Sequence, residues 1–396
     1  MNINDVVCVS ACRTAMGRFG SKLREFDVRE LGAMAISGAL KRVGIEGSVI
    51  DEVMVGHCRQ AGNGPNPAKI ASVKGGIPQD VHAMTINNAC PSGMKATIIG
   101  AQNILLGEIS TAMIAGMESM STIPYLLRSG RWDGFRMGDQ VLQDGWNDVR
   151  DVICDMLMGE TAEKLVEKYE LSREELDEFA LSSHMKAAKA QDEGWFDEEI
   201  IPVVIPATKK RPEEIFDKDE PIRKDTSLEK MGKLPAVFKK GGSVTAANSS
   251  GLSDGACALV LMSRDRAKEL GLSPLFSLVS YASVGVDGAF MGEGPGVAIP
   301  KALAKAGMDL KDMDLIEVNE AFAAQILANE RVLGWDRSKL NVHGGAIALG
   351  HPTGESGARI LITLYHALKQ MDKNIGVAGI CGGTGVACAM IIKREN

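Results

Sequence analysis

The chain has 396 residues, of which 24% are charged and 45% are hydrophobic, and its formal net charge is −7. This length suits two or three domains, and the composition is that of an ordinary globular protein. The negative balance is not that of a nucleic-acid-binding surface and no apolar run is long enough to span a bilayer, so neither nucleic acid nor membrane is expected as a partner.

The chain begins with MNINDVVCVSACRTAMGRFG, whose apolar run predicts an early strand. This stretch lacks the pattern of a secretory or transit peptide, and the terminal KREN is not a peroxisomal address. Eight cysteines are scattered along the chain without a Cys-x-x-Cys pair, so neither a disulfide framework nor a structural zinc site is expected. These features predict a cytoplasmic protein.

In INNACPSGMKA, residues 86–96, Cys90 stands directly before Pro91. Residues 83–86 read as a short strand, and the apolar positions from Met94 to Leu105 suit one face of a helix. Proline is favoured at the first position of a helix, which would put Cys90 at a strand-to-helix junction. Such a location lowers a thiol pKa and favours a nucleophilic thiolate, whereas the alternative is a buried structural cysteine.

A stretch of different character occupies roughly residues 119–247. Its segment 172–194, SREELDEFALSSHMKAAKAQDEG, predicts a helix that starts with a capping box formed by Ser172 and Glu175. Residues 209–242 are rich in proline, glycine and charge, with Lys and Arg outnumbering Asp and Glu. They indicate a long surface excursion, either a solvated loop or a rim for an anionic ligand.

Asn319, in EVNEAFAAQ (317–325), lies between a predicted strand and a predicted helix. Its amide can hold a water or polarise a carbonyl, or it can simply cap the helix. In NVHGGAIALGHPTGESGAR (341–359), His351 precedes a proline as Cys90 does. If the two helix starts pack together, a thiol and an imidazole meet in the pairing used for nucleophilic catalysis. His343 and His351 could instead bind a metal, but no cysteine or carboxylate stands beside them at ligand spacing.

The segment GICGGTGVA, residues 379–387, takes Cys381 from the end of a strand-like run into a glycine-rich turn. Glycines let the backbone approach a ligand and can direct N–H groups toward an anion. A Walker-type phosphate loop is excluded because the Gly-Lys-Ser/Thr sequence is missing, and GEGPG (292–296) has the wrong spacing for a dinucleotide fingerprint.

Four short segments recur in the same order and at nearly constant spacing. The pairs are CVSA (8–11) with LVSY (278–281), DEVMVGH (51–57) with DLIEVNE (314–320), CPSG at Cys90 with HPTG at His351, and IAGME (114–118) with VAGIC (377–381). This colinearity predicts two related halves. Strands alternate with helices in each half, which predicts an α/β arrangement.

The segments NNACPSGMKA, AGMESMS, VTAANSSGLSDGA, VNEAFAAQ, GGAIALGHPTGESGAR and CGGTG resemble the signature segments of thiolases. The resemblance runs in order from the N-terminal VVCVSACRTAMGRFG to the end of the chain. It implies the thiolase fold: two similar α/β halves, layered helix–sheet–helix–sheet–helix, with a loop domain inserted in the first. The expected boundaries are 1–268 for the N-terminal half, with the loop domain at about 119–247, and 269–396 for the C-terminal half.

The resemblance also implies roles for individual residues. Cys90 matches the acyl-accepting nucleophile, His351 the residue that activates it, and Cys381 the second cysteine, which moves a proton on the incoming or departing acyl-CoA. Asn319 matches the asparagine that positions a water in one oxyanion hole, which His351 completes. The backbone N–H groups of Cys90 and Gly383 match the other hole.

For coenzyme A, Ser250 and Arg223 match residues that contact its pantetheine and adenine parts. Lys230 stands where some relatives have a CoA-contacting serine. The residues that match apolar liners of the pantetheine tunnel are Met158, Phe238, Met291 and Phe322.

Some positions depart from the family pattern without removing a catalytic group. They are His343, where most relatives have Asn; Pro91, where Gly, Ala or Ser is common; Leu157, where many acetoacetyl-CoA thiolases have His; and Ala387, where Gly is usual. The change at Leu157 bears on the preference for short acyl chains.

The implied activity is the Claisen condensation of two acetyl-CoA to acetoacetyl-CoA and CoA, and the reverse thiolysis, through an acyl-Cys90 intermediate. CoA thioesters are then substrates, and no permanently bound cofactor or metal is expected. The alternatives are a degradative 3-ketoacyl-CoA thiolase of longer chains, a ketoacyl synthase and a non-catalytic thiolase-like protein. Ketoacyl synthases use two histidines beside the cysteine, one of them at the position of Asn319, so Asn319 with Cys381 favours a thiolase.

The resemblance further implies a homodimer or a homotetramer. Residues 119–150 form the candidate contact loop, because Leu126, Leu127, Trp132 and Phe135 have no periodic reason to be buried there.

Overall fold

The computed structural model describes residues 2–128, 130–146, 150–209 and 211–395. A large mixed sheet runs through the molecule in the strand order β15-β16-β17-β14-β1-β13-β5-β3-β4. The strands are β1 (Val6–Thr14), β3 (Glu52–Gly56), β4 (His82–Ile86), β5 (Thr111–Ser119), β13 (Ser253–Ser263), β14 (Phe276–Gly285), β15 (Leu315–Val318), β16 (Ile375–Gly382) and β17 (Val386–Arg394). The strands of the two halves meet where β1 pairs with β14 in antiparallel orientation.

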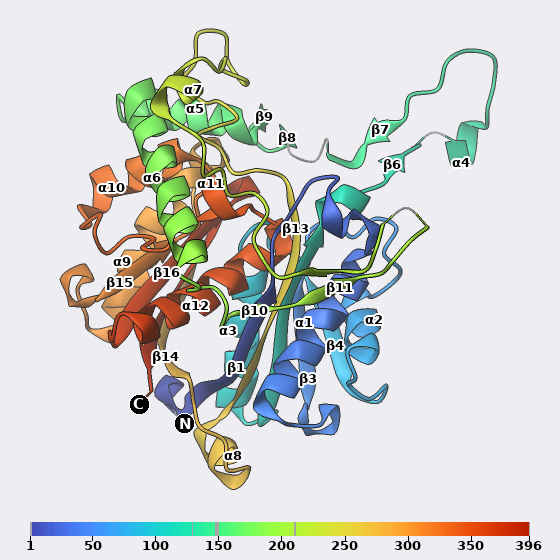
Figure 1. Cartoon of the computed structure of the whole chain (residues 1–396), viewed down its shortest axis with the longest axis vertical. Coiled ribbons are helices and arrows are strands. Elements are labelled where there is room, and N and C mark those ends of the chain that lie inside the picture. The colour runs from blue at the N-terminus through green and yellow to red at the C-terminus, as the bar shows by residue number, and fades with distance from the viewer. Residues whose placement is uncertain (1, 129, 147–149, 210, 396) are drawn as a thin grey trace.

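Helices pack against this sheet in layers (Figure 1). The helices α1 (Val28–Val43) and α2 (Pro67–Lys74) share one hydrophobic cluster with the outer face of the N-terminal strands. On the other side, α9 (Gly294–Ala306) and α10 (Ala323–Leu333) share another with the C-terminal strands. Between the two sets of strands, α3 (Ser92–Leu106) and α12 (Thr353–Gln370) pack together in a third cluster. The predicted α/β arrangement in layers is confirmed.

Strand β1 shows why the strands of the large sheet are rich in apolar residues along their whole length. Val7 and Val9 belong to the outer cluster with α1, whereas Val6 and Cys8 belong to the central cluster with α3 and α12. A strand that is covered on both faces has no solvent-facing positions to fill with polar residues. Every residue of β1 is accordingly buried.

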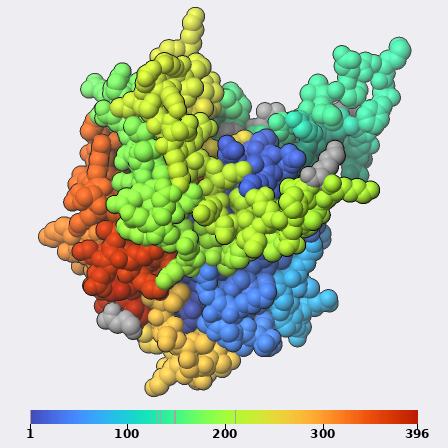
Figure 2. Space-filling model, viewed as in Figure 1, coloured from blue at the N-terminus to red at the C-terminus, as the bar shows by residue number. Residues whose placement is uncertain are grey.

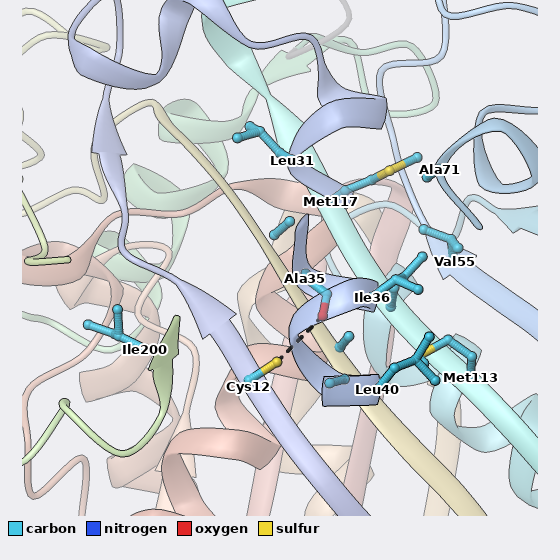
Figure 3. Packing of buried hydrophobic residues seen from close by; sticks show 14 of the residues in the cluster. Cys12, Leu31, Ala35, Ile36, Leu40, Val55, Ala71, Met113, Met117 and Ile200 are labelled. Carbon is cyan, nitrogen blue, oxygen red and sulfur yellow. Dashed lines mark hydrogen bonds between the residues drawn. The ribbon is translucent and has the colours of Figure 1, made fainter. Parts of the chain in front are cut away.

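Helix α1 begins and ends at strong local signals. Asp27 and Glu30 form a capping box at its start, and Gly44 ends it in the left-handed conformation with φ of 72°. Its apolar face packs on β5, where Figure 3 shows Leu31 and Ile36 among the side chains around Met113 and Met117. A Cβ at Gly32 would lie 2.5 Å from the Met117 sulfur, so this glycine permits the close approach of helix and strand.

The four repeated sequence segments fall on corresponding elements. They lie at β1 and β14, at β3 and β15, at the starts of α3 and α12, and at β5 and β16. In both halves the corresponding pair of strands is parallel, β3 with β5 and β15 with β16. The two helix starts that carry Cys90 and His351 therefore belong to pseudo-equivalent, directly packed helices, as predicted.

Between β5 and β13 the chain forms the inserted region and a projecting arm (Figures 1 and 2). The predicted helix is α6 (Arg173–Asp192), and its capping box is present, with Ser172 and Glu175 exchanging hydrogen bonds of 3.1 and 2.9 Å. The other elements here are β6 (Tyr125–Leu126), α4 (Gly130–Asp133), β7 (Gln143–Asp144), β8 (Arg150–Asp151), β9 (Met156–Leu157), α5 (Met158–Lys168), β10 (Ile200–Ile201), β11 (Val203–Ile205), β12 (Glu214–Phe216) and α7 (Leu228–Gly232).

Short elements complete the fold: β2 (Gly17–Arg18), α8 (Arg264–Glu269) and α11 (Ala346–Leu349). Among the described residues, none of the helices combines the length and the apolar character needed to cross a membrane.

Candidate active site

A cavity of about 430 Å³ opens at the N-terminal ends of α3 and α12. It also takes in the end of β16 and the start of α5. The predicted site residues that line it are Cys90, His351, Cys381, Gly383, Ser250, Met158, Phe238, Met291 and Phe322. Segments far apart in the sequence thus bring the thiols of Cys90 and Cys381 and the imidazole of His351 into a single cavity.

Cys90 lies in a sharp turn between β4 and α3. The preceding residue, Ala89, has φ of 50°, a left-handed conformation that non-glycine residues seldom adopt. The Ser92 hydroxyl braces the turn by accepting a hydrogen bond of 2.8 Å from the Asn88 N–H. Helix α3 begins at Ser92 with Pro91 as its N-cap, one residue later than the sequence predicts. Cys90 nevertheless occupies the expected strand-to-helix junction.

The expectation that this junction lowers the pKa of Cys90 is wrong. Burial raises the pKa of the Cys90 thiol to about 11, although the positive charge of Arg59 and the backbone N–H groups of Gly383 and Cys90 act in the opposite direction. The loss of water around the sulfur therefore outweighs its favourable place at a helix start. Cys90 rests as a neutral thiol and needs a base to become a nucleophile.

His351 has the geometry that such a base requires. The Ser356 hydroxyl donates its proton to the Pro352 carbonyl at 2.9 Å. The Ser356 oxygen therefore accepts a hydrogen bond from His351 Nδ1–H, at 2.7 Å. This arrangement puts the proton on Nδ1 and leaves the lone pair on Nε2, which is buried and has no hydrogen-bond partner within the described part of the chain. Burial, together with the positive charge of Arg359, lowers the pKa of His351 to about 4. The imidazole is therefore neutral at pH 7.

These pKa values predict how Cys90 reacts with an alkylating agent. Between about pH 7 and pH 10, its rate with iodoacetamide should rise roughly tenfold per pH unit, because the thiolate fraction grows tenfold per unit below the pKa. Peptide-resolved mass spectrometry of timed reactions measures this rate at Cys90 separately from the other cysteines. A plateau near pH 8 would show that the thiolate is already formed at the helix start.

Cys381 is the penultimate residue of β16 and is buried at the cavity wall. Burial raises the pKa of its thiol above the ordinary range, and negative charge on Cys90 raises it further. The next turn directs the Gly383 N–H at the Cys90 sulfur. Thr384, with φ of 66°, donates its N–H to Asp151 at 2.7 Å, which holds the turn against the inserted region.

Asn319 follows β15 directly and is completely buried. Its backbone N–H donates to the Gly379 carbonyl at 3.0 Å, whereas neither polar atom of its amide has a partner among the residues described. The residue that caps α10 is Phe322, so helix capping is not the role of Asn319. A buried amide without a partner is the exception in folded proteins and indicates a place for a bound water or ligand atom.

The apolar end of the cavity is tightly packed. The rings of Phe238 and Phe322 meet edge to face with centroids 6.3 Å apart. A Cβ at Gly159 would lie 2.1 Å from the Phe238 ring, so the start of α5 approaches this aromatic wall closely. Ser250 is held beside it by a backbone hydrogen bond of 3.0 Å to Ala321. This arrangement suits a slender, mostly apolar arm.

Arg223 and Lys230 do not line the cavity. The Arg223 N–H donates to His184 Nδ1 at 3.2 Å, and the Lys230 ammonium lies 3.2 Å from the Asp225 carboxylate at an exposed position. The predicted contacts of both residues with coenzyme A therefore stay predictions.

The departures from the family pattern lie outside the reacting groups. The His343 ring packs against Trp195 with centroids 4.5 Å apart, and burial lowers its pKa to about 4. This is the environment of a core histidine. Leu157 precedes the cavity-lining Met158 but is not itself part of the lining.

Cavity residues that the sequence analysis did not identify include Cys58 and Arg59. The Arg59 guanidinium lies 5.4 Å from the centroid of the Trp146 ring, also in the lining, and its charge favours the Cys90 thiolate. The internal repeat contained a signal for these residues, because it pairs DEVMVGH (51–57) with the segment that carries Asn319. The residues directly after β3 could therefore be expected near the site.

Comparisons with known proteins identify the family of this chain. The family models "Thiolase, N-terminal domain" and "Thiolase, C-terminal domain" match residues 6–265 and 272–394. An acetyl-CoA acetyltransferase of Cupriavidus necator is 48% identical over 395 residues, covering 99% of this chain and 100% of the relative. The solved acetyl-CoA acetyltransferase of Bacillus anthracis is 44% identical with a TM-score of 0.96, covering 98% of both chains.

A human mitochondrial 3-ketoacyl-CoA thiolase, solved in complex with CoA, is 40% identical with a TM-score of 0.95 and covers 99% of this chain and 98% of its own. Both halves of the sequence match, and so do the layers of the fold. The chain belongs to the thiolase family and is an acyltransferase.

Proposed function

We propose that this chain condenses two molecules of acetyl-CoA to acetoacetyl-CoA and CoA, and catalyses the reverse thiolysis. The observation that carries this proposal is the shared cavity of Cys90, His351 and Cys381, in which the imidazole has its lone pair on Nε2. One activated nucleophile and one separate acid/base are the minimum set for this chemistry. Relatives named acetyl-CoA acetyltransferase support the choice of substrate.

In the first half-reaction, His351 Nε2 takes the proton of the Cys90 thiol, and the sulfur attacks the thioester carbonyl of acetyl-CoA. The negative oxygen of the tetrahedral intermediate accepts hydrogen bonds from the N–H groups of Cys90 and Gly383, which surround the sulfur. The carbon–sulfur bond to coenzyme A then breaks, and the imidazolium returns the proton to the departing CoA thiolate. Acetyl-Cys90 and free CoA result.

In the second half-reaction, His351 Nε2 takes the proton of the Cys381 thiol, and the Cys381 thiolate removes an α-proton from a second acetyl-CoA. The enolate oxygen accepts a hydrogen bond from Nε2–H of the His351 imidazolium and another from a water that the Asn319 amide holds, which gives the unpartnered buried amide a role. The enolate carbon attacks acetyl-Cys90, a carbon–carbon bond forms, and the Cys90 thiolate leaves and takes its proton from the His351 imidazolium. This Asn319 and Cys381 pair also distinguishes the proposal from a ketoacyl synthase.

We expect kcat/KM for thiolysis to be highest with the C4 substrate and to fall for longer 3-ketoacyl-CoA chains. Met158 and Met291 line the same cavity as Cys90, and we expect their side chains to limit the space for an acyl chain. Each methylene that finds room would add about 0.8 kcal/mol, or roughly fourfold, whereas one that does not fit clashes. Measuring kcat/KM from C4 to C10 tests this. A maximum at C8 or C10 would instead indicate a degradative 3-ketoacyl-CoA thiolase.

We further propose that the chain forms a homodimer or a homotetramer. The projecting arm exposes Trp132 and Phe135, with 85% and 73% of their surfaces accessible, whereas Leu126 and Leu127 are half-buried. Exposed large apolar side chains gathered in one segment favour a contact with another protein surface, and closed symmetric assemblies are the commonest. Light scattering at micromolar concentration should give a multiple of the chain mass, and a monomer mass would contradict this proposal.

The domain boundaries and the cellular location are also proposals. A division into residues 1–268 and 269–396, with the loop domain at about 119–247, agrees with the order of the repeated elements. All eight cysteines are free thiols, which supports a reducing compartment such as the cytoplasm.

A further inference from the structure

Glu118, the penultimate residue of β5, is a completely buried carboxylate that the proposed mechanism does not use. One of its oxygens, Oε1, lies 2.9 Å from His57 Nδ1 and accepts the Arg59 N–H at 3.1 Å. The other oxygen, Oε2, accepts the Cys58 N–H at 3.0 Å. A single carboxylate thus holds the whole segment 57–59, which follows β3 and borders the cavity.

The same carboxylate holds the start of α12. Its Oε2 also accepts the Thr353 hydroxyl at 2.8 Å and the Gly354 N–H at 2.9 Å. Burial alone would raise the pKa of Glu118, but its contact with His57 and the hydrogen bonds from Thr353 and Arg59 lower it. Glu118 is therefore ionised at every pH at which the enzyme is expected to work.

His57 supplies one of these donors in a defined form. The Asn63 amide lies 3.3 Å from His57 Nε2 and 3.0 Å from the Arg59 carbonyl, where its nitrogen acts as donor. His57 Nε2 therefore accepts, and the proton lies on Nδ1, facing Glu118. All the groups around the carboxylate are donors, so a neutral amide in its place would set N–H groups against N–H groups.

The start of α12 and segment 57–59, which Glu118 joins, each lie next to one residue of the proposed catalytic pair. Thr353 lies two residues after His351 at the start of the same helix. On the other side, the Cys58 thiol donates to the Ala89 carbonyl at 3.1 Å, and Ala89 is the strained residue directly before Cys90. Glu118 thus connects the segment that carries the base with the segment that carries the nucleophile.

The internal repeat supports this reading independently. IAGME and VAGIC correspond, so Glu118 on β5 is the counterpart of Cys381 on β16. Cys381 lies close enough to Cys90, which precedes α3, for their charges to interact, and Glu118 accepts a hydrogen bond from the start of the pseudo-equivalent α12. One half of the molecule uses this position for proton transfer, and the other half has a carboxylate that binds the helix start.

We propose that Glu118 is a positioning residue that fixes the distance and orientation of His351 relative to Cys90. It acts through the start of α12 and the segment 57–59 and does not touch the substrate. This inference rests on the proposed roles of Cys90 and His351 and goes beyond them.

The test compares Glu118→Gln with Glu52→Gln. Glu52 is a matched control, because it also binds a histidine, His82 Nδ1 at 2.8 Å, and also accepts an amide, Asn103 at 2.8 Å, but at the opposite end of β3. Glu118→Gln should lower kcat by roughly 100-fold, as expected for a small misplacement of reacting groups. Its KM for acetyl-CoA should stay within about threefold, because the tunnel is unchanged.

Glu52→Gln should keep both constants near those of the wild type. A wild-type kcat per folded molecule of Glu118→Gln would overturn the proposal, and so would an equal loss of kcat in Glu52→Gln. If wild-type enzyme formed no acetyl-Cys90, the proposed function itself would fail, which is a distinct result.

Two milder variants at Thr353 keep the inference testable if the Glu118→Gln variant does not fold. Thr353→Val removes one hydroxyl donor with little change in shape and should lower kcat about tenfold with KM unchanged. Thr353→Ser keeps the hydroxyl and should restore kcat. Equal activity of the two variants would contradict the role of this hydrogen bond and overturn the proposal.

Discussion

Cys90→Ser should form no acyl-enzyme and should lose turnover by roughly 10⁴-fold or more, the order of loss that follows removal of an essential nucleophile. The reason lies in the acidity of the attacking group. Burial raises the pKa of the Cys90 thiol to about 11 and lowers the pKa of His351 to about 4, so proton transfer from the thiol to the imidazole is already uphill. A serine hydroxyl is far less acidic than a thiol, and the same imidazole with its lowered pKa cannot deprotonate it to a useful extent.

Intact-protein and peptide mass spectrometry after mixing with acetyl-CoA measures this prediction. Cys58→Ser is the matched control, because Cys58 lines the same cavity and lies close enough to Cys90 for their charges to interact. It should still carry the acetyl group on the Cys90 peptide. Turnover of Cys90→Ser near the wild-type rate, or an acetyl group that moves to Cys58, would show that the nucleophile is assigned wrongly.

The parts of the fold that the sequence predicts are those with local causes. The capping box of Ser172 and Glu175 marks the start of α6, and the glycine-rich turn marks the end of β16. The repeat predicts more, because two colinear halves imply that the helix starts with Cys90 and His351 are equivalent. The pairing of β1 with β14, which joins the two sets of strands, has no comparable signal in the sequence.

What the sequence could not predict about the site depends on contacts between distant segments. The pKa of Cys90 is raised by the burial that the whole cavity creates, and a local argument from the helix start gives the wrong sign. The ionised Glu118 likewise depends on donors from segment 57–59, which follows β3, and from the start of α12, far away in sequence. Residue types at the ends of repeated strands suggested the neighbourhood, but the balance of burial and charge needed the structure.

Cys381→Ala separates the two half-reactions. The variant should still accept an acetyl group on Cys90, because that step needs the nucleophile, His351 and the N–H groups beside the sulfur. Condensation should fall by roughly 10²- to 10⁴-fold, the range associated with loss of a general base. Cys388→Ala is the matched control: its cysteine is buried on the neighbouring strand β17, opposite Ile380, and does not line the cavity.

The order of the two steps follows from the charges in the cavity. Burial raises the pKa of Cys381, and negative charge on Cys90 raises it further, so the two thiolates disfavour each other. Acetyl-Cys90 can no longer become a thiolate, so the Cys381 thiolate forms without an opposing negative charge at the moment when an α-proton must be taken. Exchange of labelled CoA into acetyl-CoA measures the first half-reaction, and acetoacetyl-CoA formation measures both. A Cys381→Ala variant that cannot be acetylated, or that condenses like Cys388→Ala, would contradict this division of roles.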